Sequence, residues 1–228
     1  MNPTRGPYMG ATVAHATLPN GALIPAATQR KLAQTMYAEP VADRPAPGVT
    51  VFGGGFLNLT LVECDDGVLV YDTGETLEDG ARFLAQIRQV CAKPIVGVLY
   101  SHSHYVHGTS ALVGDDPDVP VVGHPRLNGN LAAGGAGSVF AEAGPLQSAR
   151  TLEQFCHFLP ASGPDAPTSI EVHFGRSGQW PVNRPVADRE QLTLGGELLE
   201  CHTAHGSDTD DCLTVFLPRR GVVLNNLL

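Results

Sequence analysis

The sequence predicts an α/β sandwich, and three observations lead to this prediction. From residue 49 onward, apolar β-branched runs alternate with helical periodicity in the order strand, helix, strand, helix, strand. The run Ile95–Tyr100 is apolar throughout, which favours a central strand buried on both faces. Four further short apolar runs follow between residues 191 and 224. This alternation is typical of sheets that pack against helices and against each other.

The composition excludes several classes of protein. The 228 residues carry 14 Lys+Arg and 23 Asp+Glu, a net charge of −9, which disfavours nucleic-acid binding through a basic face. Hydrophobic residues make up 43% of the chain, enough for a buried core. Charged residues make up only 16%, which excludes a disordered acidic chain. No run approaches the roughly 18 apolar residues of a membrane span, and the N-terminus lacks the apolar stretch of a signal peptide. We therefore expect a cytoplasmic protein without a nucleic-acid or membrane partner.

The cysteines predict free thiols. Their number is odd, they are widely spaced, and no Cys-x-x-Cys pair occurs. We expect reduced and mostly buried thiols rather than disulfides. The five positions are Cys64, Cys91, Cys156, Cys201 and Cys212.

The first part of the chain divides into an arm and a hairpin. Residues 1–48 hold one predicted helix, Ala26–Tyr37, between Pro-rich stretches, and are expected to form an N-terminal arm. The domain is expected to span 49–228 and to begin with strands at Val49–Phe52 and Phe56–Glu63. A turn with the sequence DDG then leads into a strand at 68–71, so the last two runs predict a β-hairpin.

A helix and two strands follow. Thr76 is the expected N-cap, with Asp79 as a partner resembling a capping box, and Pro94 lies just beyond the end of the helix. Apolar residues with helical spacing form one face of it: Leu77, Ala81, Leu84, Ile87 and Cys91. The buried strand Ile95–Tyr100 comes next, and a short helix connects it to a strand at Val119–Gly123.

The remaining chain contains an irregular stretch and then four strands. Residues 132–188 show weak periodicity and many Gly and Pro residues, so we expect an insertion or lid. Strands are predicted at 191–194, 197–202, 212–217 and 222–224.

Three histidines lie at the C-terminal end of the buried strand. They are His102, His104 and His107, within the segment SHSHYVHG. Spacing i, i+2 in an extended segment places two side chains on one face, and a turn can bring the third around. Neutral imidazole is the commonest metal ligand, and α/β folds place their sites beyond the carboxyl ends of strands. The pattern therefore predicts a metal site.

These motifs resemble those of the metallo-β-lactamase superfamily. That family carries His-x-His-x-Asp-His after a buried strand, a preceding strand that ends in Asp-Thr-Gly, and a later ligand motif. Here residues 70–74 read VYDTG, residues 100–108 read YSHSHYVHG and residues 202–208 read HTAHGSD, in the family's order and spacing. The resemblance covers residues 49–228 apart from 132–188. Within the superfamily, the sequence is most similar to the alkyl-sulfatase branch.

The resemblance implies an αββα sandwich with metal ions at the sheet edge. The family metals are usually zinc and sometimes iron or manganese. By position, His102 and His104 would bind the first ion together with either His205 or Asp208. His107 would bind a second ion, and Asp72 would support the site from behind.

The chain departs from the family pattern at two places. Val106 replaces the Asp of the His-x-His-x-Asp-His motif, and Asn225 or Asn226 stands where the family has a metal-bridging carboxylate. Both changes affect the second metal, so we expect one or two ions. The sequence also stops at Leu228, where family members continue, which predicts an incomplete sandwich and a homo-oligomer or a completing chain.

The predicted function is a metal-dependent hydrolase of a small-molecule ester or sulfate ester. The resemblance implies attack by a metal-bound hydroxide. Asp208, Asp210 or Asp211 could serve as general base, and Tyr105 is a candidate hydrogen-bond donor to the developing oxyanion. Two alternatives remain open: a non-catalytic or partner-dependent protein that has lost its second metal, and an iron-binding redox variant.

Overall fold

The computed structural model describes residues 4–5, 12–17, 21, 23–26, 41–53, 57–133 and 176–226. The chain divides into two compact units. The first comprises 1–40, 54–56 and 142–172, and the second comprises 41–53, 57–141 and 173–228. Three expectations lie outside the described residues: the helix at Ala26–Tyr37 apart from Ala26 itself, most of the insertion at 132–188, and the state of Cys156. The division into an arm and a domain at residue 48 stays a prediction.

The described part of the first unit consists of two short antiparallel pairs. β1 (Thr4–Arg5) pairs with β2 (Thr12–Val13), and β3 (His15–Thr17) pairs with β4 (Leu23–Pro25). All of the expected site residues belong to the second unit.

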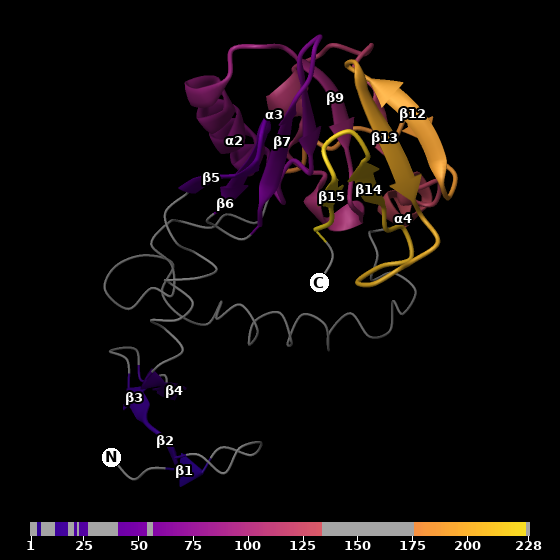
Figure 1. Ribbon diagram of the computed structural model, residues 1–228. Helices are drawn as coiled ribbons and strands as arrows, with labels where there is room; N and C mark the ends of the chain where they lie inside the picture. Colours follow the sequence, from indigo (N-terminus) through magenta and orange to yellow (C-terminus); the bar gives the residue numbers. More distant parts are fainter. Residues whose placement is uncertain are drawn as a thin grey trace. The chain divides into compact units, whose positions relative to one another are not determined.

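The second unit is built on a seven-stranded sheet with the strand order β11-β10-β9-β8-β7-β6-β5 (Figure 1). The strands β8, β9, β10 and β11 are parallel to one another. The pairs β5–β6, β6–β7 and β7–β8 are antiparallel. The bounds are β5 Val41–Ala46, β6 Val49–Gly53, β7 Leu59–Glu63, β8 Val68–Tyr71, β9 Ile95–Leu99, β10 Val121–Gly123 and β11 Arg184–Pro185.

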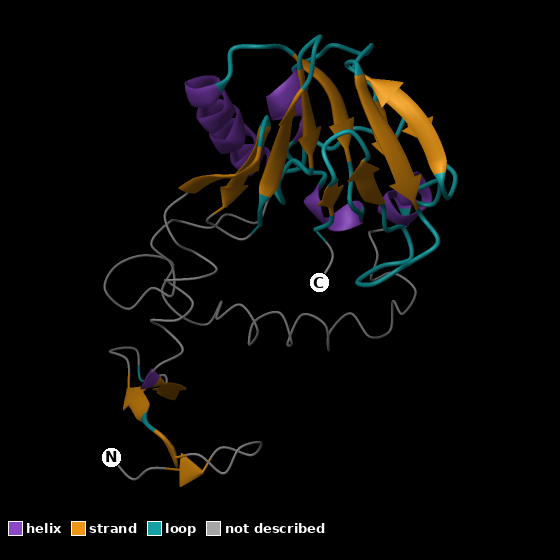
Figure 2. Cartoon of the chain, in the orientation of Figure 1, coloured by secondary structure: helices purple, strands orange, loops and turns teal. Residues whose placement is uncertain are grey.

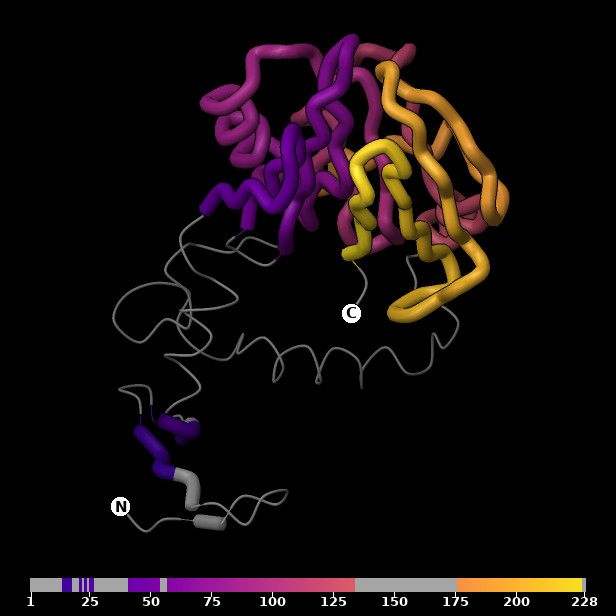
Figure 3. The backbone as a smooth tube through the Cα atoms, in the orientation of Figure 1, coloured from indigo at the N-terminus to yellow at the C-terminus, as the bar shows by residue number. Residues whose placement is uncertain are grey.

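A second, four-stranded sheet is formed by consecutive antiparallel strands, coloured orange to yellow in Figure 3. The bounds are β12 Glu190–Leu194, β13 Glu197–His202, β14 Thr214–Leu217 and β15 Val222–Leu224. The described helices of this unit are α2 Leu77–Val90, η1 Ser103–Tyr105, α3 Thr109–Val113 and α4 Leu127–Ala132 (Figure 2).

Two apolar cores lie on the two faces of the seven-stranded sheet. Val68 and Val70 of β8 belong to the core that includes Ile87 of α2. The alternate residues of the same strand, Leu69 and Tyr71, belong to the core shared with the four-stranded sheet. Side chains that alternate along the strand therefore point into different cores, and the layers follow in the order helices, seven-stranded sheet, four-stranded sheet. The predicted α/β sandwich is therefore confirmed, and in the described residues helices cover one side of it.

Most predicted elements of the domain occur where the sequence places them. Thr76 caps α2, because its Oγ1 accepts a hydrogen bond from the Asp79 amide at 3.0 Å. The strand Ile95–Leu99 is buried on both faces as expected, with only Val96 partly exposed. The four cysteines in the described ranges are free and buried, which confirms that prediction for them.

The edge strand β5 begins at Val41, before the expected start of the domain. The sequence analysis predicts no strand here, because β5 is largely exposed and contains Pro45, a residue typical of loops. An edge strand tolerates proline, since only one of its sides must donate to a neighbour. Across the parts of the chain that the structure describes, no helix is long and apolar enough to cross a membrane.

Candidate metal centre

The first two candidate ligands lie where β9 ends. β9 is an interior strand of the seven-stranded sheet, and the chain then passes through buried Tyr100 and Ser101 to His102. The short turn η1 carries His104, so that His102 Nε2 lies 3.2 Å from His104 Nδ1. The parallel strands β8, β9 and β10 end at the same edge, which is the usual location of sites in such sheets.

The third candidate ligand comes from the four-stranded sheet. Asp208 lies in the loop between β13 and β14, and its Oδ2 is 2.8 Å from His104 Nδ1 and 3.5 Å from His102 Nε2. Ligand atoms of these three residues all lie within 4.8 Å of one another. His102 is 1% exposed, whereas the Asp208 side chain is 45% exposed. The group is therefore buried on one side and open to solvent on the other.

The environment keeps His102 in the neutral form that binds metals. Burial, followed by the neighbouring His104, lowers the pKa of His102 from 6.5 to about 4. Its Nδ1 lies 2.8 Å from Ser101 Oγ. When Nε2 serves as a ligand, Nδ1 carries the ring proton and donates a hydrogen bond to the Ser101 hydroxyl. This hydrogen bond fixes the orientation of the ring.

The donor set fits a divalent transition-metal ion. Two imidazole nitrogens and one carboxylate oxygen suit zinc, and they suit iron as well. Three protein ligands leave a coordination position open, which distinguishes catalytic from structural zinc sites. The exposed carboxylate of Asp208 marks the side from which solvent or a substrate can approach.

The other predicted ligands lie apart from this group. His107 is outside it, with Nδ1 2.8 Å from Ser177 Oγ, and burial lowers its pKa. His205 is exposed and is also outside the group. Of the two alternatives for a third ligand, the structure brings Asp208 to the histidine pair and not His205. Val106 is 0% exposed and belongs to the apolar core on the helix side of the sheet.

Two of the predicted catalytic residues besides Asp208 have different surroundings. The ring of Tyr105 packs edge-on against His102 with 4.7 Å between centroids. Burial, followed by the charge of Glu75, raises the pKa of Tyr105 to about 12, so its hydroxyl keeps its proton at neutral pH. Asp211 is 0% exposed and its carboxylate is fully enclosed by the protein.

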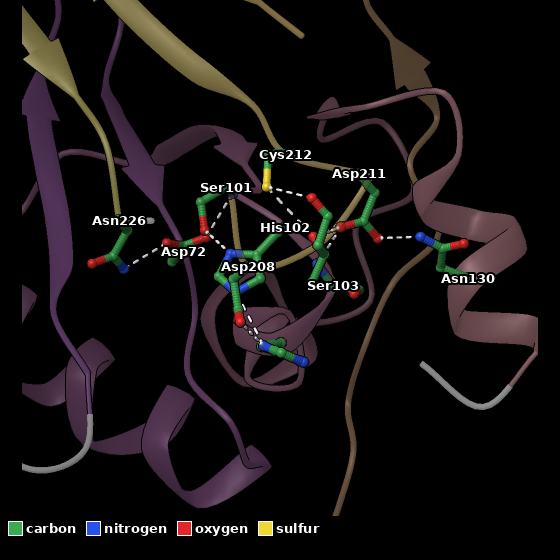
Figure 4. A network of polar contacts seen from close by, with 11 residues as sticks. Asp72, Ser101, His102, Ser103, Asn130, Asp208, Asp211, Cys212 and Asn226 are labelled. Carbon is green, nitrogen blue, oxygen red and sulfur yellow. Dashed lines mark hydrogen bonds and ion pairs between the residues drawn. The ribbon is translucent and has the colours of Figure 1, made fainter. Parts of the chain in front are cut away.

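Asp72 supports the histidine segment from β8. Its backbone is left-handed, with φ of 65°, a conformation that Asp tolerates better than most residues. Oδ1 accepts a hydrogen bond from the Ser101 amide at 2.8 Å, and Oδ2 accepts one from Asn226 Nδ2 at 2.7 Å. Burial raises the pKa of Asp72 from 3.8 to about 7, although both hydrogen bonds lower it. Asn226 thus contacts Asp72, the residue that holds the histidine segment in place (Figure 4).

Sequence reasoning missed the residues that hold the Asp208 loop. Asn130 of α4 donates from Nδ2 to Asp210 Oδ1 at 2.8 Å and to Asp211 Oδ2 at 2.9 Å. Asp188 Oδ1 accepts hydrogen bonds from the amides of Thr203 and Ala204. Asn130 and Asp188 lie outside every motif, so no sequence signal pointed to them.

The comparison with protein families identifies the class of the protein. The profile of the metallo-beta-lactamase superfamily matches residues 52–224. The chain therefore belongs to this superfamily, as its histidine motif implies.

Individual relatives include two alkylsulfatases. The chain is 31% identical over 58 residues to a linear primary-alkylsulfatase of Pseudomonas sp. (strain ATCC 19151), a stretch that covers 25% of this chain and 11% of that protein. The solved structure of the stereoselective inverting sec-alkylsulfatase Pisa1 from Pseudomonas sp. has a TM-score of 0.63 at 20% identity and covers 90% of this chain. The chain spans 37% of that sulfatase structure, little more than a third of its length.

A metallo-beta-lactamase from Cronobacter sakazakii is also similar. It has a TM-score of 0.53 at 17% identity, over 96% of this chain and 65% of that chain. At such low identity, both structural matches show the shared fold and leave the reaction open.

Proposed function

We propose that the chain is a metal-dependent hydrolase that acts on small-molecule esters or sulfate esters. The observation that carries this proposal is the convergence of His102, His104 and Asp208 at the sheet edge of a metallo-beta-lactamase fold. The three side chains come from both sheets of the sandwich, and their ligand atoms face one another across less than 5 Å. Members of this superfamily typically bind divalent metals, often zinc.

One zinc ion per chain is the proposed cofactor, with iron or manganese as alternatives. His102 Nε2, His104 Nδ1 and Asp208 Oδ2 would hold it. When bound, a divalent ion supplies Lewis-acid activation of water and of an ester or sulfate-ester oxygen. Because only one of the three ligands is charged, the occupied site keeps a net positive charge, which favours an anionic substrate such as a sulfate ester.

The surrounding residues orient groups and keep protons in place. Ser101 Oγ holds the Nδ1 proton of His102, and Asp72 fixes the backbone that carries both histidines. Tyr105 is assigned as the hydrogen-bond donor to the substrate, because its ring packs against the ligand His102 and a tyrosine hydroxyl carries its proton at neutral pH. Of the three candidate bases, Asp210 pairs with Arg126 and Asp211 is buried, so proton transfer is assigned to Asp208, through the carboxylate oxygen that would not hold the ion.

The sulfate-ester preference is supported by similarity to alkylsulfatases. Both sulfatase relatives are much longer than this chain, so their substrates enter here as a proposal. A completing chain or a second copy of this one also stays a prediction. Val106 favours the second candidate function, a non-catalytic protein with one metal, since the family carboxylate is absent there.

The test is metal content and turnover in the same preparations. The purified chain, stripped with chelator and reloaded with Zn²⁺, is analysed for metal and screened with an aryl acetate, an aryl sulfate and dodecyl sulfate. The comparison variant is His102→Ala/His104→Ala, and His205→Ala is the matched control outside the group. We expect about one zinc per chain and zinc-dependent hydrolysis, both lost in the double variant and kept in the control.

Two results would contradict the proposal. Zinc-dependent turnover that persists in the double variant would place the chemistry elsewhere. One bound zinc without turnover of any ester would favour the non-catalytic protein.

A further inference from the structure

A fully buried carboxylate lies beside the candidate metal centre. Asp211 is 0% exposed, and it lies between Ser103 and Asn130 in Figure 4. Its Oδ1 accepts hydrogen bonds from the Thr209 hydroxyl and, at 3.4 Å, from the Ser103 amide. Its Oδ2 accepts one from Asn130 Nδ2 at 2.9 Å. A buried carboxylate is costly unless such donors satisfy it, so these contacts hold Asp211 in one geometry.

The three donors belong to the segments that form the site. Ser103 lies between the ligands His102 and His104, Thr209 follows the ligand Asp208, and Asn130 belongs to α4. One side chain therefore connects the histidine segment, the Asp208 loop and the helix layer. The histidine segment and the Asp208 loop, which it joins, are more than a hundred positions apart in the sequence.

Most side chains near the Asp208 ligand lie on the surface, and residues 204–208 are all exposed. Upstream, Asp188 accepts hydrogen bonds from the amides of Thr203 and Ala204. Downstream, Asp210 accepts a hydrogen bond from Asn130 at 2.8 Å and pairs with Arg126 at 3.1 Å, and the side chains of this ion pair are both more than half exposed. Such an exposed ion pair contributes little, whereas the enclosed contacts of Asp211 are expected to matter.

We propose that Asp211 is a positioning residue that sets the distance between Asp208 and the histidine pair. This inference rests on the proposed metal centre. Asp211 has no exposed surface with which to touch a substrate, so it acts through the ligands. Outer-shell partners of this kind affect metal affinity about 10–100-fold when they are removed.

The test is the affinity of the full chain for Co²⁺. The visible absorption of the bound cobalt ion measures the binding. The variant Asp211→Asn keeps the shape but sets an amide group against the donors around it. Asp210→Asn is the matched control, the same change one residue away on an exposed side chain. We expect the Kd to rise about 10–100-fold in Asp211→Asn and less than about threefold in Asp210→Asn. Circular dichroism measures how much of each variant is folded. The Kd is calculated from the concentration of folded protein.

A double-mutant cycle separates positioning from general stability. If Asp211 acts through Asp208, then Asp211→Asn changes the Kd little in an Asp208→Ala background. The milder variant Thr209→Val removes one donor with little change in shape, and its Kd should move in the same direction. It provides the test if Asp211→Asn does not fold.

The outcomes distinguish this inference from the proposed function. A folded Asp211→Asn protein with unchanged Kd, or an equal loss with and without Asp208, overturns the positioning role alone. A wild-type chain that binds no Co²⁺ overturns the metal centre together with it.

Discussion

The two halves of the histidine segment have the same sequence character and different surroundings. In the first half, His102 and His104 face each other and meet Asp208. In the second half, Val106 lies in the apolar core and His107 contacts Ser177. The difference teaches that three histidines close together in sequence need not serve one centre. Among the residues that the structure describes, a group of three ligand atoms forms around the first half, so we expect one metal ion rather than two.

Asn226 adds to this contrast from the other sheet. It stands where the family resemblance places a bridging carboxylate, yet its amide donates to Asp72 at 2.7 Å. The same amide donates to the Asn58 carbonyl at 3.0 Å. Asn226 therefore ties the end of β15 to the support of the histidine segment.

The largest expected effect is on a ligand of the first half. His104→Ala removes one of the three converging donors, so the Co²⁺ affinity should fall more than the ~100-fold that outer-shell changes produce. Equilibrium titration measures this. An affinity within tenfold of the wild type would show that the first half does not hold the metal.

The next effect is on the second half. Val106→Asp places a carboxylate in the apolar core, and the free energy of unfolding should fall by about 2–3 kcal/mol in chelator. Urea unfolding measures the loss. We expect the metal content to stay near one ion per chain, because His107 lies outside the ligand group. A rise to two ions would mean that the second half lacks only its carboxylate.

A smaller, pH-dependent effect is expected at Asn226. Asn226→Asp sets a second carboxylate against Asp72, whose pKa burial already raises from 3.8 to about 7. A carboxyl group with a raised folded-state pKa stabilises the protein most at low pH, and this stabilisation disappears as the pH rises through the folded value. The variant should therefore lose about 1–2 kcal/mol at pH 8 and much less at pH 5, where the pair holds a proton. Urea unfolding of metal-free protein at both pH values measures this, and a loss independent of pH would contradict it.

The smallest effect is expected at His107. His107→Ala removes a contact with Ser177 and no ligand, so the Co²⁺ Kd should change less than about threefold, the opposite of His104→Ala. The two titrations run side by side form the direct comparison of the two halves. A large loss of Co²⁺ affinity in His107→Ala would show that both halves bind the same metal centre.

Much of the fold was predictable because strong local patterns agree with the tertiary structure. The apolar strand before the histidines, the Thr76 cap and the strands β8, β13 and β15 occur where periodicity and turn residues place them. β5 was not predictable, since an exposed edge strand with a proline lacks the apolar alternation that marks a strand in a sequence.

The site was predictable only in part. Spacing and strand context pointed to His102 and His104, but the third ligand remained open between His205 and Asp208. The proposed choice of Asp208 depends on the course of an exposed loop, which long-range contacts from Asp188 and Asn130 hold. Such contacts join residues far apart in sequence and leave no local pattern.

The location of the three candidate ligands on both sheets has a consequence for the lifetime of the protein. His104 follows the seven-stranded sheet and Asp208 belongs to the four-stranded one, so a bound ion would act as a cross-link between the two layers. Binding to the folded state alone stabilises it by about 4 kcal/mol at a free metal concentration about 1,000 times the Kd. Metal supply in the cell would then govern how often the sandwich opens and how fast proteases remove it.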